Sequence, residues 1–231
     1  MKPQADEMTI EQLESHGYMA GGTKNHDRPV LICDVDEVVL HLVKPFVTIL
    51  TERGFKLKTN TFKLVGNVYD AETGREATQA EVWGGLHQLF EEQAERQGLV
   101  DGAVAGLSKV AEHIDIVFLT NMPHPYGDKR REYLEANGLD FPLITNTGSK
   151  VEAIRRIQSR ASQPLGFIDD TPLNLEQVRD ALPDVNIFHF MADENFRKLA
   201  GEIKGAHFST GCWVEASGGI RSTLMENNGR T

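Results

Sequence analysis

Short apolar runs that alternate with longer, helix-type stretches constrain the fold of this chain more than any other feature of its sequence. The four clearest runs, and a weaker fifth at 141–145, have the length of buried strands: 30–33, 114–119, 165–168 and 185–190. Helix-type stretches separate or follow most of them: 102–112, 126–137, 149–160, 172–181 and 194–203. Continuous apolar strands that alternate with helices are typical of a parallel sheet covered on both faces. The pattern predicts an α/β fold with a doubly wound, Rossmann-like parallel sheet.

The interval between the first two runs is too long for a simple crossover connection. It contains a helix-type opening, a polar and strand-prone piece, and a second helix-type stretch: 43–53, 55–69 and 77–97. The second stretch carries an apolar stripe at helical spacing, which is more typical of packing than of ligand contact: Trp83, Leu86, Leu89 and Phe90. We interpret residues 43–100 as a small, mainly helical cap inserted into a catalytic core of residues 29–42 and 101–216.

The two ends of the chain are polar. Residues 1–28 are expected to form an N-terminal arm with one short helix from Thr9 to His16. The pair Gly21-Gly22 in this arm does not predict a phosphate loop, because no strand precedes it. Residues 217–231 are expected to form a flexible C-terminal tail, which Trp213 anchors to the core.

Composition excludes some function classes. The 231 residues are 40% hydrophobic and 25% charged, as in ordinary globular proteins, and the formal net charge of −10 disfavours a non-specific nucleic-acid binder. The only two cysteines, Cys33 and Cys212, have neither disulfide-framework nor zinc-ligand spacing. No stretch approaches the ~20 apolar residues that span a bilayer, and the first residues do not resemble a signal peptide. We expect a cytoplasmic protein without nucleic-acid or membrane partners, in an oligomeric state that the sequence leaves open.

Polar side chains follow the predicted strands at the points where ligands bind in open α/β sheets. Acidic or polar side chains follow the first three clear runs: Asp34 and Asp36, then Thr120 and Asn121, then Asp169 and Asp170. Lys150 opens the helix-type stretch that precedes the third of these runs. Each residue alone is more typical of a helix cap, a turn or a solvated surface. Together, in this order, they predict a single site at one edge of the sheet.

The set suits phosphoryl transfer. Asp34 can attack phosphorus as a nucleophile without first losing a proton, and Asp36 is close enough to act as general acid and base. Thr120, the backbone N–H of Asn121 and the Lys150 ammonium can hold the phosphoryl oxygens of the substrate. Several carboxylates at one point need a cation, and a sparse set of oxygen ligands without nitrogen or sulfur favours Mg²⁺.

These segments resemble the four signatures of the haloacid dehalogenase (HAD) superfamily. The signatures correspond to 31–39, 116–121, Lys150 and 166–170, and the resemblance covers about residues 29 to 205. It implies Asp34 as nucleophile and metal ligand, and Asp36 as general acid/base whose backbone carbonyl also binds the metal. Asp169 and Asp170 would complete the Mg²⁺ site, with Asp170 favoured as the inner ligand.

The resemblance also narrows the chemistry. Members that break carbon–halogen bonds lack the second aspartate, so Asp36 indicates phosphoryl chemistry, and a cap between the first two signatures suggests a small soluble substrate. Glu37 departs from many capped members, which have glycine at this position, and the chain matches no subfamily well. Eight residues in the cap and beside the strand ends are candidates for substrate specificity, although each alone is more typical of a surface or packing position: Lys56, Lys58, Lys63, Arg75, Trp83, His87, Met122 and His124.

The sequence therefore predicts a magnesium-dependent phosphatase that hydrolyses a small phosphomonoester through an aspartyl-phosphate intermediate. A phosphomutase or phosphotransferase of the same superfamily is an alternative, because it shares the phosphorylated aspartate. A catalytically silent binding or regulatory protein on the same fold is a second alternative from a different class.

Overall fold

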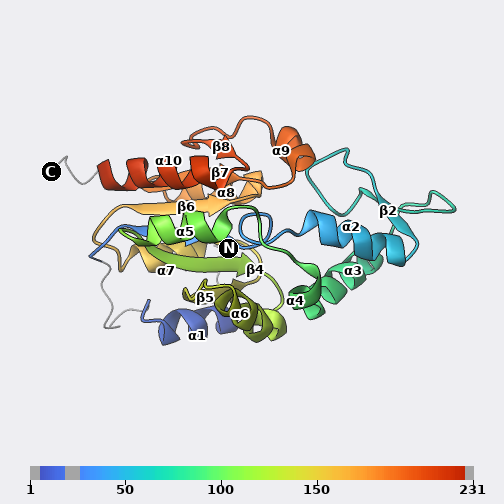
Figure 1. The fold of residues 1–231 in the computed structure, drawn as a ribbon, viewed down its shortest axis with the longest axis horizontal. Coiled ribbons are helices and arrows are strands. Elements are labelled where there is room, and N and C mark those ends of the chain that lie inside the picture. The colour runs from blue at the N-terminus through green and yellow to red at the C-terminus, as the bar shows by residue number, and fades with distance from the viewer. Residues whose placement is uncertain (1–5, 19–26, 227–231) are drawn as a thin grey trace.

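A parallel sheet of six strands forms the centre of the computed structural model, which describes residues 6–18 and 27–226. Its strand order is β5-β4-β1-β6-β7-β8, and every neighbouring pair is parallel (Figure 1). The strands are β1 (Val30–Cys33), β4 (Asp115–Asn121), β5 (Leu143–Asn146), β6 (Leu165–Asp169), β7 (Val185–Phe190) and β8 (Ser209–Thr210). The prediction of a doubly wound α/β sheet is confirmed.

Helices cover both faces of the sheet, and the apolar strands explain why. In β1, Leu31 and Cys33 face one apolar cluster while Val30 and Ile32 face the other. Helices α5 (Ala103–Ala111), α6 (Gly127–Ala136) and α10 (Trp213–Glu226) pack in the first cluster. The second cluster contains α1 (Glu7–Ser15), α7 (Val151–Gln158) and α8 (Pro172–Ala181), and α9 (Glu194–Ala200) follows β7. Among the described residues no helix is long and apolar enough to cross a membrane.

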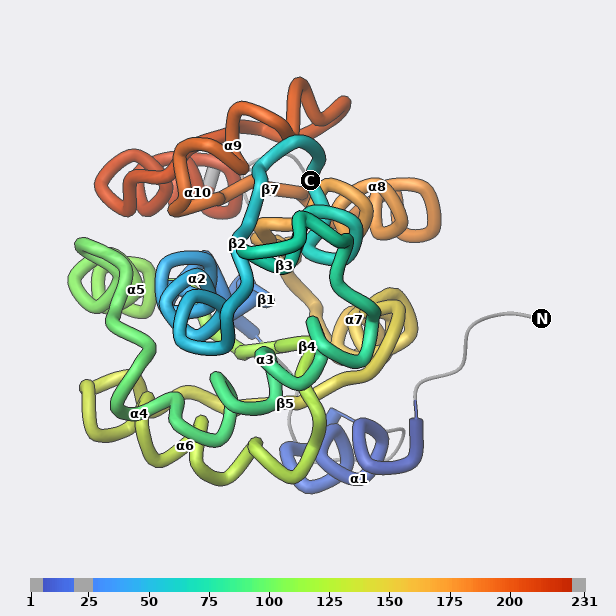
Figure 2. The backbone as a smooth tube through the Cα atoms, turned by 90° about the vertical axis from the view of Figure 1, so that its right-hand side faces the viewer, coloured from blue at the N-terminus to red at the C-terminus, as the bar shows by residue number. Residues whose placement is uncertain are grey.

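The long interval between β1 and β4 lies beyond one end of the sheet (Figures 1 and 2). It contains α2 (Val43–Glu52), an antiparallel pair β2 (Phe55–Leu57) and β3 (Val68–Asp70), then α3 (Gln79–Glu91) and α4 (Gln93–Arg96). Helices α2 and α3 share an apolar cluster, to which the core contributes the buried Met122. A capping box formed by Thr78 and Glu81 begins α3. We call residues 43–97 the inserted segment.

The expected N-terminal arm includes a packed helix. Helix α1 begins two residues before the expected Thr9, and its side chains bind the edge strand β5: the Thr9 hydroxyl donates to the Thr145 carbonyl at 2.9 Å, and Gln12 Oε1 accepts from the Thr145 N–H at 2.7 Å. These bonds occupy backbone groups that an edge strand otherwise leaves open. Gly21 and Gly22 lie outside the described residues.

The prediction of a flexible tail from residue 217 is wrong as far as residue 226. Helix α10 continues to Glu226, with Ile220 and Leu224 fully buried, and residues 227–231 lie outside the described part of the chain. The helix was missed because Gly218, Gly219 and two serines weaken its local helix signal. Packing on α5 and the sheet stabilises it instead.

The close approach of α10 to α5 depends on Gly106. A methyl group at this position would lie 2.8 Å from Cε3 and 3.0 Å from Cβ of the buried Trp213, whereas one at the exposed Gly218 would meet nothing within 4 Å. We expect Gly106→Ala to lower the free energy of unfolding by about 1–3 kcal/mol through overpacking. Gly218→Ala should raise it by about 0.5–1 kcal/mol, because alanine favours the helix.

Urea unfolding of the two variants beside the unmodified protein checks this prediction. Equal effects of the two substitutions would show that α10 does not pack on α5 as described.

Candidate active site

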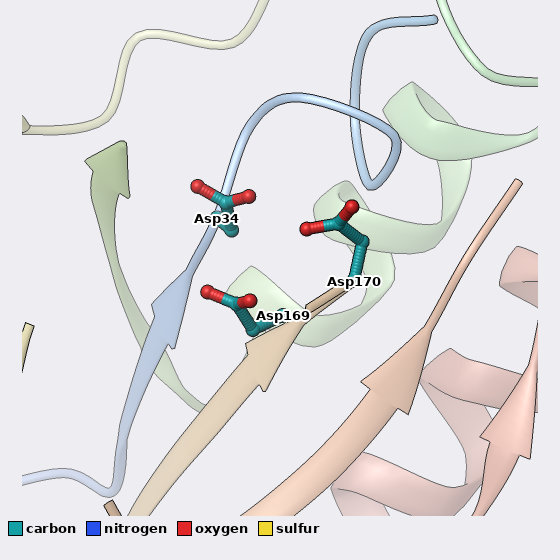
Figure 3. Close-up of side chains that lie close together, drawn as sticks. All are labelled: Asp34, Asp169 and Asp170. Carbon is teal, nitrogen blue, oxygen red and sulfur yellow. The ribbon is translucent and has the colours of Figure 1, made fainter. Parts of the chain in front are cut away.

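Three carboxylates meet at the carboxyl end of the two central strands. Because Cys33 is in register with Ile168, Asp34 and Asp169 come side by side as β1 and β6 end, and the Asp34 N–H donates to the Ile168 carbonyl at 2.9 Å. One carboxylate oxygen from each of Asp34, Asp169 and Asp170 lies within 4.8 Å of the others (Figure 3). The parallel register therefore brings Asp34 next to two side chains that lie 135 and 136 residues further along the sequence.

Lys150 reaches this cluster from the N-terminus of α7. Its side chain is almost fully buried, and its Nζ donates to Asp34 Oδ1 at 2.6 Å and to Asp169 Oδ2 at 2.7 Å. A buried ammonium needs such partners, since its transfer out of water is costly. Lys150 thus holds both carboxylates in fixed positions.

Asp169 and Asp170 have different surroundings. Asp169 is fully buried: its Oδ1 accepts from the Thr171 N–H and from Asn174 Nδ2, both at 2.9 Å, and its Oδ2 accepts from Lys150. Asp170 lines the adjoining cavity, and only its Oδ1 accepts a hydrogen bond from a described residue, the Thr171 hydroxyl at 2.9 Å. Asp170 therefore has the freer carboxylate.

The electrostatics of the cluster favour a cation. Burial raises the pKa of Asp34 to about 7, although Lys150 opposes this rise, and Asp169 and Asp36 add to it. Burial and the charges of Asp169 and Asp34 also raise the pKa of Asp170 well above its ordinary value. Burial acts to lower the pKa of Lys150, but Asp169 and Asp34 raise it above its ordinary value, so the ammonium stays charged.

The residues present fit a divalent metal ion. If all three carboxylates are ionised, three negative charges face the single positive charge of Lys150, which leaves two uncompensated. The donor atoms are oxygens, with no histidine or cysteine in the group. Hard oxygen ligands with an excess of two negative charges suit Mg²⁺.

Thr120 and Asn121 end β4 beside the same cavity. The Thr120 hydroxyl is buried and has no hydrogen-bond partner within the described part of the chain, which leaves it free for a ligand. The Asn121 side chain is engaged in the protein: its Nδ2 donates to the Gly148 carbonyl at 2.8 Å, and its Oδ1 accepts from Asn146 at 2.7 Å. Of the two side chains, that of Thr120 is the one whose polar atom has no partner among the described residues.

A cavity of about 320 Å³ opens above these groups. Its polar wall comes from the end of β4, from the segments that follow β1 and β6, and from the starts of α7 and α8: Asp34, Asp36, Glu37, Thr120, Asn121, Lys150, Asp170, Thr171 and Asn174. Its apolar wall comes from the inserted segment and the residue before it, and from both sides of the start of α9: Leu42, Val43, Phe62 and Leu64, then Met191 and Phe196, with Lys63 at the side. The structure therefore brings all of the predicted site residues except the buried Asp169 to the wall of one cavity, with Asp169 directly behind it.

Solved structures with the same fold come from several bacteria. A conserved haloacid dehalogenase-like protein of unknown function from Agrobacterium tumefaciens has a TM-score of 0.59 at 12% identity, over 85% of this chain and 98% of that one. A haloacid dehalogenase-like family hydrolase from Streptococcus pneumoniae has a TM-score of 0.56 at 9% identity, over 84% and 98%. A HAD family hydrolase from Deinococcus radiodurans, with bound phosphate and sodium, has 0.55 at 13%, over 86% and 96%.

The chain has the haloacid dehalogenase fold. The resemblance that the four signatures carry is thereby confirmed at the level of the fold. No protein-family model matches the sequence, and no curated protein matches it either. The likeness to these solved structures, at 9–13% identity, is therefore a likeness of fold.

A buried hydrogen-bond network holds Asp36 from behind, and sequence reasoning missed it. Asp36 Oδ1 accepts from Gln97 Nε2 at 2.8 Å and from Arg130 Nη1 at 3.2 Å. Arg130 is fully buried, and it also donates to Gln97 Oε1 at 2.9 Å and to Gln93 Oε1. Helical spacing gave one signal that Arg130 is buried. It lies three residues after Gly127 and four before Leu134, which places it on the buried face of α6.

Glu37 also has a role that its sequence position alone did not reveal. Its backbone is left-handed, with φ of 58°, a conformation that favours glycine. Its Oε1 accepts from the N–H groups of Leu42 and Val43 at the start of α2, both at 2.7 Å, and its Oε2 accepts from the Asp193 N–H at 2.9 Å. The carboxylate thus caps α2 and links the inserted segment to the loop before α9.

The Arg130 network can be tested by stability. Arg130→Met leaves Asp36 and two glutamine side chains without their cationic partner, and we expect the free energy of unfolding to fall by about 3 kcal/mol. The neighbouring Arg131 has 38% of its side chain exposed and pairs with Asp128 on the same helix, so Arg131→Met should cost less than about 1 kcal/mol.

Chemical denaturation of both variants gives the comparison. A loss for Arg130→Met no larger than that for Arg131→Met would contradict the buried network.

Proposed function

We propose that this protein is a magnesium-dependent phosphatase that hydrolyses a small phosphomonoester through a phosphorylated Asp34. The observation that carries the proposal is the buried Asp34 at the floor of the cavity. Lys150 fixes it beside two further carboxylates and the Thr120 hydroxyl, which has no hydrogen-bond partner among the described residues. A nucleophile, a fixed cation and a free donor at one point are the parts that phosphoryl transfer requires.

Asp34 is the proposed nucleophile. Lys150 holds its Oδ1, and none of the described residues donates a hydrogen bond to its Oδ2, which is therefore free to attack. Attack of this oxygen on phosphorus forms an Asp34–phosphorus bond while the bond from phosphorus to the substrate's alcohol oxygen breaks. Thr120 and Lys150 stabilise the negative charge on the phosphoryl oxygens during this step.

Asp36 is the proposed general acid and base. Gln97 and Arg130 hold its Oδ1, while Oδ2 receives no hydrogen bond from a described residue. Asp36 gives a proton to the departing alcohol oxygen and then takes a proton from the water that attacks phosphorus. The second step breaks the Asp34–phosphorus bond, so that inorganic phosphate leaves and Asp34 is restored.

Asp34, the backbone carbonyl of Asp36, Asp169 and Asp170 would hold the Mg²⁺ ion. The ion supplies positive charge that neutralises the carboxylates and the phosphoryl oxygens. Asp170 is the better inner ligand of the aspartate pair, because three donors already engage the oxygens of Asp169. Asp169 would then act by holding Lys150 in position.

Phosphatase activity can be tested with acetyl phosphate and glycerol phosphate in the presence of magnesium. We expect Asp34→Asn to lower kcat by roughly a thousandfold or more, because an amide does not replace the attacking carboxylate. Asp184→Asn is a matched control, since Asp184 is exposed on the loop that enters β7 at the opposite end of the sheet, and it should retain full activity.

Turnover by Asp34→Asn equal to that of the unmodified protein would exclude Asp34 as nucleophile. If the unmodified protein hydrolyses neither compound, the phosphatase proposal itself fails. Transfer of the phosphoryl group to a second hydroxyl, rather than release of inorganic phosphate, would favour the phosphomutase alternative.

Magnesium binding can be tested without activity. At a hundredfold excess over its Kd, Mg²⁺ should raise Tm by about 5–10 °C. Burial holds the pKa of Asp34 at about 7, above the 3.8 of an ordinary aspartate. Protons therefore compete with the metal below about pH 7, and the magnesium-dependent rise in Tm should shrink as the pH falls through that value.

Thermal unfolding across this pH range gives the measurement. Asp170→Asn should abolish most of the rise in Tm, whereas Asp184→Asn should leave it intact. A rise that Asp170→Asn does not reduce would assign the inner metal ligand to another residue.

A further inference from the structure

A second cavity adjoins the cavity above Asp34. It has a volume of about 350 Å³ and shares three wall residues with the first: Leu42, Leu64 and Asn121. The shared wall residues place the two cavities next to each other, one above Asp34 and the other beside it. The second cavity is therefore the place for the part of the substrate that does not react.

Apolar and aromatic side chains dominate this second cavity. The inserted segment supplies Trp83, Leu86 and Phe90 from α3, and the core supplies Met122 and Pro123. Asn146, Thr147 and Gly148 close the remaining side. Leu86, Phe90 and Met122 are buried, whereas Trp83 keeps 43% of its surface exposed. An indole with this much free surface beside a cavity is a ready platform for an aromatic ring.

The Trp83 ring belongs to a row of aromatic side chains. Its centroid lies 6.2 Å from that of His87, the His87 ring lies 5.8 Å from Tyr126, and Tyr126 lies 5.9 Å from Phe90. A hydrogen bond of 2.9 Å joins His87 Nδ1 and the Tyr126 hydroxyl. These contacts hold α3 against the 3₁₀ turn His124–Tyr126, so the Trp83 platform is formed before a ligand binds.

None of the described residues that line the second cavity is charged, which argues against a second anionic group on the part of the substrate that enters it. Most cationic side chains of the inserted segment have protein partners elsewhere. Lys58 lies over the Tyr69 ring at 4.4 Å, Arg75 pairs with Glu81 at 2.9 Å, and Arg96 pairs with Glu52 at 2.7 Å. Lys63 lines the first cavity and not the second. An uncharged body is the better match.

We infer that the substrate is a phosphomonoester whose alcohol part carries an uncharged aromatic or heteroaromatic ring, which stacks on Trp83. The inference rests on the proposed phosphatase activity. A short linker joins the ring to the phosphoryl group, because the ring lies in the second cavity and the phosphoryl group in the first. Trp83 is then a specificity-determining residue for the alcohol part and takes no part in the bond changes.

The experiment compares phosphomonoesters that share a reacting group. Naphthylethyl phosphate carries a ring on a short linker, adenosine monophosphate carries a heteroaromatic ring, and glycerol phosphate carries no ring. We expect kcat/KM to be roughly thirtyfold higher for the better ring-bearing compound than for glycerol phosphate, because ring burial contributes mainly to binding. The two ring-bearing compounds distinguish a plain aromatic from a heteroaromatic substrate.

Variants at Trp83 assign the effect. Trp83→Ala should lower the preference for the ring-bearing compound by roughly tenfold, mainly through KM, and Trp83→Phe should restore most of it. Val214→Ala is the matched control, since Val214 is 79% exposed on α10 and lines neither cavity. Calorimetric titration of the ring-bearing compound into Asp34→Asn protein, with and without Trp83→Ala, measures binding without turnover and should show the same weakening.

Two negative results are distinguishable. Equal kcat/KM for the ring-bearing compounds and glycerol phosphate, or a preference that Trp83→Ala does not change, would overturn the inference while the phosphatase proposal stands. Failure to hydrolyse these compounds and acetyl phosphate would overturn the phosphatase proposal, and this inference with it.

Discussion

The buried ammonium of Lys150 between Asp34 and Asp169 is the interaction on which the rest of the site depends. Its two short bonds, 2.6 and 2.7 Å, join the start of α7 to the ends of β1 and β6. Removing one member would leave an uncompensated buried charge, so the three groups are fixed as a unit. The same burial leaves the carboxylates short of positive charge, because Lys150 balances only one of the three when all are ionised. The rigidity of the cluster and its uncompensated negative charge thus have one electrostatic cause.

A second group of polar bonds connects Asp36 to the inserted segment. Gln97 donates from one amide nitrogen to Asp36 Oδ1 and to the His41 carbonyl, at 2.8 and 3.0 Å. The His41 N–H in turn donates to the Gly98 carbonyl at 2.8 Å, so the chains that enter and leave the inserted segment are joined next to Asp36. Any displacement of the segment acts directly on this carboxylate. Arg130, from the other side, limits that displacement because it holds both Gln97 and Asp36.

The sequence predicted those parts of the molecule that follow from local pattern. Apolar runs identified the central strands, and the rule that ligands bind at their carboxyl ends brought Asp34, Thr120 and Asp169 to one edge. The parts of the structure that the sequence did not predict depend on tertiary contacts. Helix α10 has weak local signals and is stabilised by the burial of Ile220 and Leu224. The sequence around Arg130 distinguishes it from its more exposed neighbour Arg131 only by helical phase. The roles assigned to the cluster in catalysis and metal binding stay predictions.

The hydrogen bonds of Glu37 help to fix the shape of the cavity, although the inserted segment joins the core through only two short connections. A residue other than glycine in the left-handed region is strained by about 1 kcal/mol, so this position must be stabilised elsewhere. Three backbone N–H groups donate to its carboxylate at 2.7–2.9 Å, and its own carbonyl accepts from Ala192 at 3.0 Å. These bonds fix the start of α2 against the loop before α9. Since Gln97 fixes the other connection, both ends of the inserted segment are held, and the two cavities are largely formed before a substrate binds.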